Sequence, residues 1–294
     1  MDQLGAPEEM RARSLDARRA GRRIALVPTM GALHAGHLSL LRVARARADV
    51  VVLSVFVNPL QFGPTEDFAR YPRDLERDRR LAASAGADVL WAPATDAMYP
   101  EPPRVTVQPG DAGARLEGAA RPGHFAGVLT VVLKLLSVVG PDVAVFGRKD
   151  LQQAALVRRM ARDFNLPVEI VVAPTVRDRD GLALSSRNAY LAAEPRRQAG
   201  AIPRALARGV ELFGGGERSA AALAAAAREV LEREDGVTVD YVACVRAEDA
   251  EPVAAADAGT AMVAAARVGG PAGTRLIDNV ILGEGLEGDE RITG

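Results

Sequence analysis

Cysteine, lysine and histidine are scarce in this sequence of 294 residues, and each scarcity limits what the chain can do. A single cysteine, Cys244, rules out an internal disulfide and any zinc site built from several cysteines. Its apolar surroundings in VDYVACVRA favour a buried structural thiol over a nucleophile. Lys134 and Lys149 are the only lysines among 37 basic residues, so a lysine within a motif becomes a candidate functional residue.

Long apolar runs and an excess of one sign of charge are also missing. No stretch of about 18 consecutive apolar residues occurs, and the N-terminal segment has no apolar core of the signal-peptide type. We therefore expect a cytoplasmic protein with no membrane partner. The formal net charge is −1, which gives no overall basic field for binding nucleic acid, so no nucleic-acid partner is expected either.

The first 175 residues alternate apolar, β-rich runs with helical patterns. Strands are predicted at 22–28, 48–57, 87–93, 141–147 and 167–174, and helices at 37–48, 73–85, 127–139 and 151–164. Nearly continuous Val, Ile and Leu strands separated by helices indicate a parallel sheet covered on both faces. We therefore expect an α/β, Rossmann-like doubly wound domain, with residues 104–110 as a further edge strand.

The pattern changes after residue 175. Two alanine-rich helical patterns, 195–212 and 219–232, precede three strand-like runs at 237–245, 261–268 and 274–282. Helices followed by strands predict a smaller C-terminal α+β domain. The domains are therefore expected at 1–175 and 176–294, with the joint between Pro174 and Asp180.

The segment PTMGALHAGH, at 28–37, contains two of the three histidines. A strand that ends at Val27 and a helix that begins near His37 place backbone N–H groups and the positive end of a helix dipole at the carboxyl edge of the sheet. Phosphate binds at such places. Neither G-x-G-x-x-G nor G-K-[ST] is present, so the segment is neither the dinucleotide fingerprint nor a P-loop.

His34 and His37 admit three interpretations. They can be zinc ligands on one helix face, although no third ligand lies nearby in the sequence. They can also be hydrogen-bonded residues of a turn. We favour the third interpretation, in which both imidazoles donate hydrogen bonds to nucleotide phosphates while Gly31 and Gly36 let the backbone approach the ligand. A helix N-terminus opposes a charged imidazole and a phosphate favours it, so the protonation state stays open.

The histidine motif also carries a resemblance to a known family. H-x-G-H after a strand resembles the signature of the nucleotidyltransferases related to class I aminoacyl-tRNA synthetases. The longer PTMGALHAGHLSLL is similar to the pantoate–β-alanine ligase (pantothenate synthetase) family. Further similar segments run along nearly the whole chain: SVFVNPLQFGPTEDFARYPR (54–73), LEGAARPGHFAGVLTVVLKLL (116–136), PDVAVFGRKDLQQ (141–153), PTVRDRDGLALSSRNAYL (174–191) and TRLIDNVIL (274–282).

The resemblance implies an activity and a set of site residues. The activity is the ATP-dependent condensation of (R)-pantoate with β-alanine to pantothenate, through a pantoyl adenylate, with release of AMP and pyrophosphate. The catalytic residues it implies are His34, His37, Lys149 and Arg187. The pantoate and β-alanine site it implies contains Gln61 and Gln153, whose neutral amides suit hydroxyl and carboxylate groups. The implied ATP contacts are Met30, Gly31, Ala32, Leu33, His34, Ala35, Gly36, His37, Gly147, Arg148, Lys149, Asp150, Val176, Leu184, Ser185, Ser186 and Arg187.

The segment FGRKD ends a predicted strand and opens a helix. An ammonium group held there, on Lys149, can neutralise charge that builds on an attacked phosphate. Lys134 lies inside an apolar helix, where we expect its alkyl chain to carry the charge to the surface. The family usually has an acidic or neutral residue where this chain has Arg148, and we expect that side chain to point outward.

Two further segments complete the candidate site. In LALSSRN, two hydroxyl groups and the guanidinium of Arg187 suit a triphosphate, although a serine-rich interdomain turn is the simpler interpretation of that segment alone. In RPGHFAGV, Arg121 is expected to attract a carboxylate and, with His124, to line the site. Mg²⁺ is expected to arrive with ATP, and the acidic segment 66–78 identifies no protein ligand for it.

Two anions must meet in the first step of this reaction, so positioning and charge neutralisation are expected to matter more than covalent catalysis. The C-terminal domain is a candidate lid that protects the adenylate from water. The resemblance also implies a homodimer. Two other functions stay open: a tRNA-charging enzyme, for which the chain lacks a basic face, and a non-catalytic nucleotide-binding regulator, although all four catalytic candidates are present.

Overall fold

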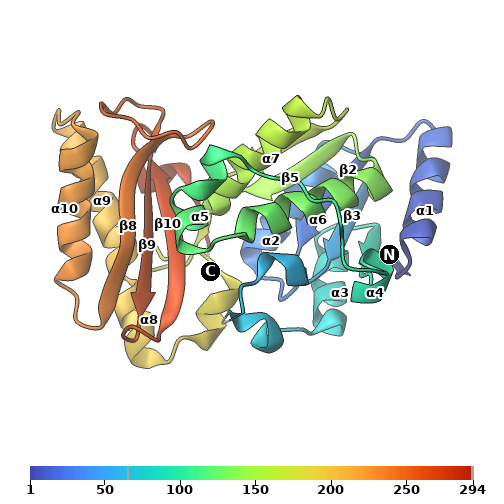
Figure 1. The fold of residues 1–294 in the computed structure, drawn as a ribbon, viewed down its shortest axis with the longest axis horizontal. Coiled ribbons are helices and arrows are strands. Elements are labelled where there is room, and N and C mark those ends of the chain that lie inside the picture. The colour runs from blue at the N-terminus through green and yellow to red at the C-terminus, as the bar shows by residue number, and fades with distance from the viewer. Residues whose placement is uncertain (65, 293–294) are drawn as a thin grey trace. The chain divides into compact units, whose positions relative to one another are not determined.

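In the computed structural model the chain folds as two units, each with its own sheet (Figure 1). The structure describes residues 1–64 and 66–292. The first unit comprises Met1–Gly147 and Leu156–Ala173. The second comprises Arg148–Ala155 together with the described residues from Pro174 onward.

The first unit contains a six-stranded sheet in which every pair of neighbours is parallel, as the apolar runs predicted. In spatial order the strands are β1 (Asp2–Leu4), β4 (Val89–Trp91), β3 (Val50–Val55), β2 (Ile24–Thr29), β5 (Val143–Gly147) and β6 (Glu169–Ala173). Successive side chains of β2 and β3 point to opposite faces, yet nearly all are buried, because helices cover both faces. The doubly wound α/β class is thus confirmed.

Helices pack on this sheet in two groups. On one face α2 (Ala35–Arg45) and α3 (Leu75–Ser84) bury a cluster in which Leu41 and Ala44 meet Val27 and Leu53. On the other face α1 (Pro7–Arg19) and α6 (His124–Val139) contact each other and β2. The remaining helices and 3₁₀ turns that begin in this part of the chain are η1 (Pro59–Gln61), η2 (Asp67–Arg70), α4 (Thr95–Met98), η3 (Asp111–Ala114), α5 (Glu117–Ala120), η4 (Arg148–Asp150) and α7 (Leu151–Asp163).

One edge strand of the sheet is β1, which pairs with β4 and which the sequence did not predict. The predicted edge strand at 104–110 is wrong, because these residues form no strand. Pro109 has no N–H for a ladder, and Val105 leaves 86% of its surface exposed, so pairing would bury little. The N–H of Val107 donates instead to Thr130 Oγ1 at 3.0 Å.

The second unit is built on a three-stranded antiparallel sheet. Its strands, in spatial order, are β10 (Thr274–Ile281), β9 (Thr260–Val268) and β8 (Val237–Arg246). Figure 1 shows α9 (Ala201–Gly214) and α10 (Ala220–Glu232) beside this sheet, and both helices contact its strands. The helix predicted at 195–212 is divided at Gly200 into α8 (Ala193–Ala199) and α9. Pro203 has no N–H to donate, so it is accommodated only in the first turn of a new helix.

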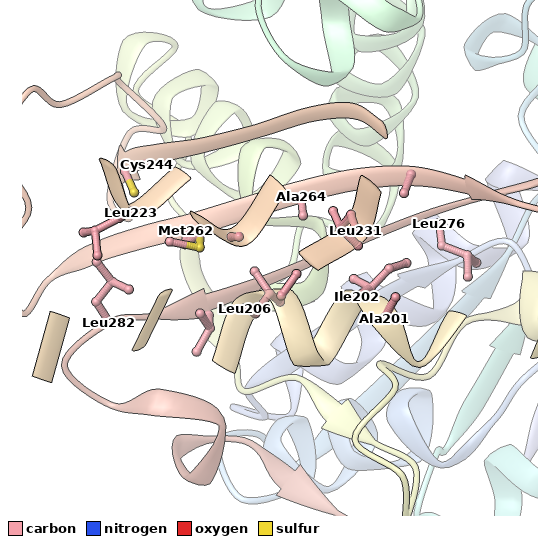
Figure 2. Close-up of a cluster of buried hydrophobic side chains, with 14 of the residues drawn as sticks. Ala201, Ile202, Leu206, Leu223, Leu231, Cys244, Met262, Ala264, Leu276 and Leu282 are labelled. Carbon is pink, nitrogen blue, oxygen red and sulfur yellow. The ribbon is translucent and has the colours of Figure 1, made fainter. Parts of the chain in front are cut away.

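Apolar side chains from α9, α10 and the sheet form the core of the second unit (Figure 2). Ile202 and Leu206 of α9 and Leu231 of α10 are fully buried there. Helix α9 approaches β9 so closely that a Cβ at Gly209 would lie 2.2 Å from the Cε of Met262. Cys244 is buried in the same cluster, and burial raises the pKa of its thiol to about 11, which confirms its structural role.

Two short strands and two 3₁₀ turns complete the second unit. They are β7 (Val176–Arg177), which pairs in parallel with β11 (Glu290–Arg291), together with η5 (Ser186–Tyr190) and η6 (Gly285–Gly288). Across residues 1–64 and 66–292, no helix has the length and apolar character needed to cross a membrane.

Candidate active site

The strand order of the first unit reverses at β2. Strands β3 and β4 lie on one side of β2, whereas β5 and β6 lie on the other. In doubly wound folds, ligands bind outside the carboxyl ends of the strands at such a switch point. The chain leaves the carboxyl end of β2 through Met30–Leu33 and enters α2 at Ala35, with His34 as the N-cap residue. The histidine motif therefore lies at the position where this fold class binds ligands.

A buried carboxylate shapes the turn before the histidines. Asp78 of α3 accepts the N–H of Ala32 at 2.9 Å and the N–H of Leu33 at 2.7 Å. Burial raises the pKa of Asp78, although these two hydrogen bonds act in the opposite direction. Gly31 has φ +83°, and a Cβ there would lie 2.8 Å from Asp78 Oδ2, so the close approach requires glycine. Sequence reasoning missed this role of Asp78, since only the fold shows that one acidic side chain of 66–78 turns inward.

The two imidazoles of the motif lie against each other, with ring centroids 4.1 Å apart. The N–H of His34 donates to Nδ1 of His37 at 3.3 Å. Because Nδ1 of His37 accepts in this hydrogen bond, Nε2 is the ring nitrogen that can donate to a ligand. That Nε2–H is a directional donor, as the phosphate interpretation requires. Among the residues that the structure describes, no group of three His, Cys, Asp or Glu side chains forms a metal-ligand set, so the zinc interpretation gains no third ligand.

Gln61 ends η1, just after β3, and its side-chain amide has a fixed orientation. Its Oε1 accepts from Asn58 Nδ2 at 3.1 Å, and its Nε2 lies 3.2 Å from Met30 Sδ. Asn58 is oriented in turn by the hydroxyl of Tyr99, which donates to Asn58 Oδ1 at 2.9 Å. The relay leaves Gln61 with its amide hydrogens beside the segment that follows β2. Asn58 and Tyr99 were both missed from the sequence, because their contact joins residues 41 positions apart.

His124 binds the main-chain carbonyl of Gln61. Arg121 Nη1 lies 3.0 Å from His124 Nε2, so Nε2 accepts and Nδ1–H donates to the carbonyl of Gln61 at 2.9 Å. Burial, followed by the charge of Arg121, lowers the pKa of His124 to about 4. Arg121 was expected to attract a carboxylate, and it holds that of Glu66 with two bonds of 2.7 and 2.6 Å. Burial would raise the pKa of Glu66, but Arg121 outweighs it and lowers that pKa.

In the second unit, Lys149 lies on the three-residue turn η4. Its ammonium is 3.7 Å from Asp150, and the main chain of the turn is held by Asn279, whose Nδ2 donates to the carbonyls of Arg148 and Lys149, each at 2.9 Å. The other lysine, Lys134, lies in the first unit with its Nζ 5.2 Å from the centre of the Tyr99 ring. Asn279 was missed from the sequence, because its partners precede it by about 130 residues.

The expectation that Arg148 points outward is wrong. Its guanidinium donates to Glu284 at 2.6 Å and to Asp289 at 2.7 Å. Two acidic residues far along the chain therefore attract it, and no local sequence pattern indicates this pairing. The side chain is committed within the second unit, so any ATP contact of Arg148 falls to its main chain.

Local hydrogen bonds hold the LALSSRN segment in place. The N–H of Leu184 donates to the carbonyl of Val176 at 2.9 Å, which brings these two candidate residues together. Ser185 caps η5 and accepts the N–H of Arg187 at 3.3 Å. In the first unit the structure likewise brings Met30 to Gln61, whereas Gln153 lies half-buried on α7 in the second unit.

Comparison with known proteins gives one consistent family. The sequence profile of the family described as Pantoate-beta-alanine ligase matches residues 3–281. The pantothenate synthetase of Geobacter sulfurreducens is 51% identical over 276 residues, which cover 94% of this chain and 96% of that protein. The pantothenate synthetase of Moorella thermoacetica is 53% identical over 266 residues, which cover 90% of this chain and 93% of that protein.

Solved structures agree with the sequence comparison. The crystal structure of pantothenate synthetase from Thermus thermophilus has a TM-score of 0.88 and 47% identity, covering 96% of this chain and 99% of that one. The pantoate-beta-alanine ligase from Francisella tularensis, complexed with beta-gamma ATP and beta-alanine, has a TM-score of 0.78 and 31% identity, covering 97% and 99%.

We expect His124 to stay neutral from pH 8 to pH 5 and to make the fold sensitive to acid. An unperturbed imidazole has a pKa of 6.5, whereas burial lowers that of His124 to about 4. The stability that depends on a neutral His124 is therefore full above pH 6.5 and is lost as the pH falls through 4, by on the order of 3 kcal/mol. Two-dimensional NMR of the three imidazoles measures the titration, and urea unfolding at pH 7 and pH 5 measures the stability. A His124 resonance that titrates near pH 6.5 contradicts the prediction.

Proposed function

Since the chain belongs to the Pantoate-beta-alanine ligase family, we propose that it forms pantothenate through an enzyme-bound pantoyl adenylate. As a member of this family it is a ligase that condenses pantoate with β-alanine at the expense of ATP. In the proposed first step, a carboxylate oxygen of (R)-pantoate bonds to the α-phosphorus, and pyrophosphate leaves with the electron pair of the broken P–O bond. In the second, the amine of β-alanine bonds to the acyl carbon, AMP leaves, and the nitrogen loses a proton.

The imidazole pair at the start of α2 carries the proposal. His37, whose Nδ1 accepts the N–H of His34, donates to a phosphate oxygen from Nε2. His34 acts beside it as a second phosphate donor. Lys149, Arg187 and magnesium supply positive charge that neutralises the phosphates.

We assign pantoate to Gln61 and Gln153. The Oε1 of Gln61 accepts from Asn58, and one hydrogen of Nε2 is directed to Met30 Sδ, so the group that Gln61 offers a ligand is the second hydrogen of Nε2, which suits a carboxylate or hydroxyl oxygen. Support from His124 and Arg121 at the Gln61 carbonyl keeps this donor in place. A fixed donor favours the orientation in which the carboxylate of pantoate attacks.

We assign ATP to the remaining candidate residues, 30–37, 147–150, 176 and 184–187. Lys149 offers an ammonium for the α-phosphate, and the hydroxyl groups at Ser185 and Ser186 together with Arg187 suit the triphosphate. ATP would be used as its magnesium complex, and magnesium bound to ATP would take its ligands mainly from phosphate and water oxygens and would neutralise part of the phosphate charge.

The adenylate intermediate predicts an isotope exchange. With pantoate and MgATP but no β-alanine, we expect radiolabelled pyrophosphate to appear in ATP, because the first step is reversible while the adenylate stays bound. Omission of pantoate, or addition of EDTA, is expected to stop the exchange, and excess Mg²⁺ to restore it. Exchange that also requires β-alanine would contradict a separate adenylate step.

Loss of one phosphate donor is expected to slow the first step strongly. Lys149→Ala and His37→Ala should each reduce pantoate-dependent exchange by roughly 100-fold, or about 3 kcal/mol of barrier, as for removal of a donor that stabilises transition-state charge. Arg204→Gln provides a matched control, because it removes a cation of the second unit that pairs with Glu234 and lies outside the candidate site. Near wild-type exchange in both site variants is the result that overturns these assignments.

We further propose that the protein acts in the cytoplasm as a homodimer. Sedimentation equilibrium tests the assembly, with an expected mass of twice the 31.0 kDa chain. The mass of a single chain at micromolar concentration contradicts the dimer, and it leaves the reaction proposed above untouched.

A further inference from the structure

A fully buried arginine in the second unit anchors a network of charges. Arg177 of β7 is 0% exposed, and all five of its N–H groups have acceptors. Asp278 accepts two of them at 2.6 and 3.0 Å, and Asp289 accepts one at 2.6 Å. The carbonyls of Gly181 and Asn279 accept the other two. A guanidinium with every donor engaged is held in one orientation, so it can fix the groups around it.

Asp289 links this anchor to the turn that carries Lys149. The carboxylate of Asp289 is 1% exposed, with Oδ2 bound to Arg177 and Oδ1 bound to Arg148 Nη2 at 2.7 Å. Arg148 also donates to Glu284 at 2.6 Å. The residue directly before Lys149 is therefore tied by its side chain to the buried network.

Asn279 ties the same turn by its main chain. One side-chain nitrogen, Nδ2, donates to the carbonyls of both Arg148 and Lys149 at 2.9 Å. Asn279 follows Asp278 on β10, and the N–H of Asn279 donates to Asp278 Oδ1 at 2.7 Å. We refer to Arg148, Arg177, Asp278, Asn279 and Asp289 together as the C-terminal clamp.

The turn η4 joins the end of β5 at Gly147 to the start of α7 at Leu151, and its main-chain carbonyls at Arg148 and Lys149 are fixed from outside by Asn279. The ammonium of Lys149 ends a flexible four-carbon chain, and its position is only as well defined as the backbone that carries it. A misplacement of about 1 Å at a reacting centre can cost on the order of 100-fold in rate.

One member of the clamp, Asp289, and the neighbouring Glu284 lie outside the range of the family match, which ends at residue 281. Arg148 occupies a position at which, by the resemblance described above, the family usually has an acidic or neutral residue. Arg148 is positively charged, and its two partners outside the family match, Glu284 and Asp289, are negatively charged and lie within hydrogen-bonding distance of it.

We propose that the C-terminal clamp positions Lys149, with Arg148 and Asp289 as positioning residues. The inference rests on the role proposed above for Lys149 in adenylate formation. Neither positioning residue need touch a substrate, because both act through the backbone of η4.

A double-mutant cycle tests the inference. Arg148→Gln is made in the wild-type chain and in Lys149→Ala, and pantoate-dependent exchange is measured in all four proteins. We expect Arg148→Gln to lower kcat by about 10-fold when Lys149 is present, with KM for pantoate changed less than about twofold. In the Lys149→Ala background, we expect no further loss, because nothing remains to be positioned.

Two more variants separate positioning from a general loss of stability. Asp289→Asn keeps the shape of the bridging carboxylate but removes its charge, and it is expected to reproduce the kcat effect. Arg204→Gln is the matched control, since it removes an arginine from an exposed ion pair with Glu234 in the same unit. Its kcat is expected to equal that of the wild type. Urea unfolding of every variant verifies that the proteins compared are folded.

The outcomes are distinct. An effect of Arg148→Gln only when Lys149 is present supports the inference. An equal loss in both backgrounds, or none in either, overturns it while the role of Lys149 stands. Wild-type exchange by Lys149→Ala alone overturns the role of Lys149 and the inference together.

Discussion

Parallel pairing of β2 with β3 determines where the reactive groups of the first unit meet. The ladder sets Thr29 opposite Val55, so the two strands end level with each other. The segments that follow them therefore start at the same edge, and the contact between Met30 and Gln61 is a direct result. Because β5 pairs with the other side of β2, the strand order reverses at this edge, which is where doubly wound sheets bind their ligands.

Hydrogen bonds inside the protein determine which atoms of the candidate site are left to bind a ligand. Asp78 fixes the turn after β2 by accepting two of its N–H groups. The N–H of His34 binds Nδ1 of His37, and Asn58 binds Oε1 of Gln61, so in these two side chains Nε2 is left to donate to a ligand. The site is therefore organised as a set of oriented donors before any substrate arrives, which lowers the reorganisation needed during reaction.

Much of this was predictable from local sequence patterns. Apolar runs predicted five of the six parallel strands, and PTMGALHAGH placed both histidines between a strand and a helix. The prediction of a strand at 104–110 was wrong because its valines are typical of a strand, whereas Pro109 has no N–H to contribute to a ladder. The choice among a ligase, a tRNA-charging enzyme and a regulator required the whole chain, and the family match over residues 3–281 decides for the ligase. Asp78 and the partners of Arg148 were not predictable, because each acts on residues distant in the sequence.

The C-terminal clamp also bears on how the protein is made. Arg148 and Asp289 are separated by 141 residues, so a ribosome produces the arginine long before its carboxylate partner. Until then the turn that carries Lys149 lacks Asp278, Asn279 and Asp289, and the sheet that supplies two of them is also incomplete. Closing a loop of this length is slow compared with local helix formation. The contacts of the lysine turn can therefore be completed only after residue 289 has been synthesised, whereas Asp78, the partner of the histidine turn, is available far earlier.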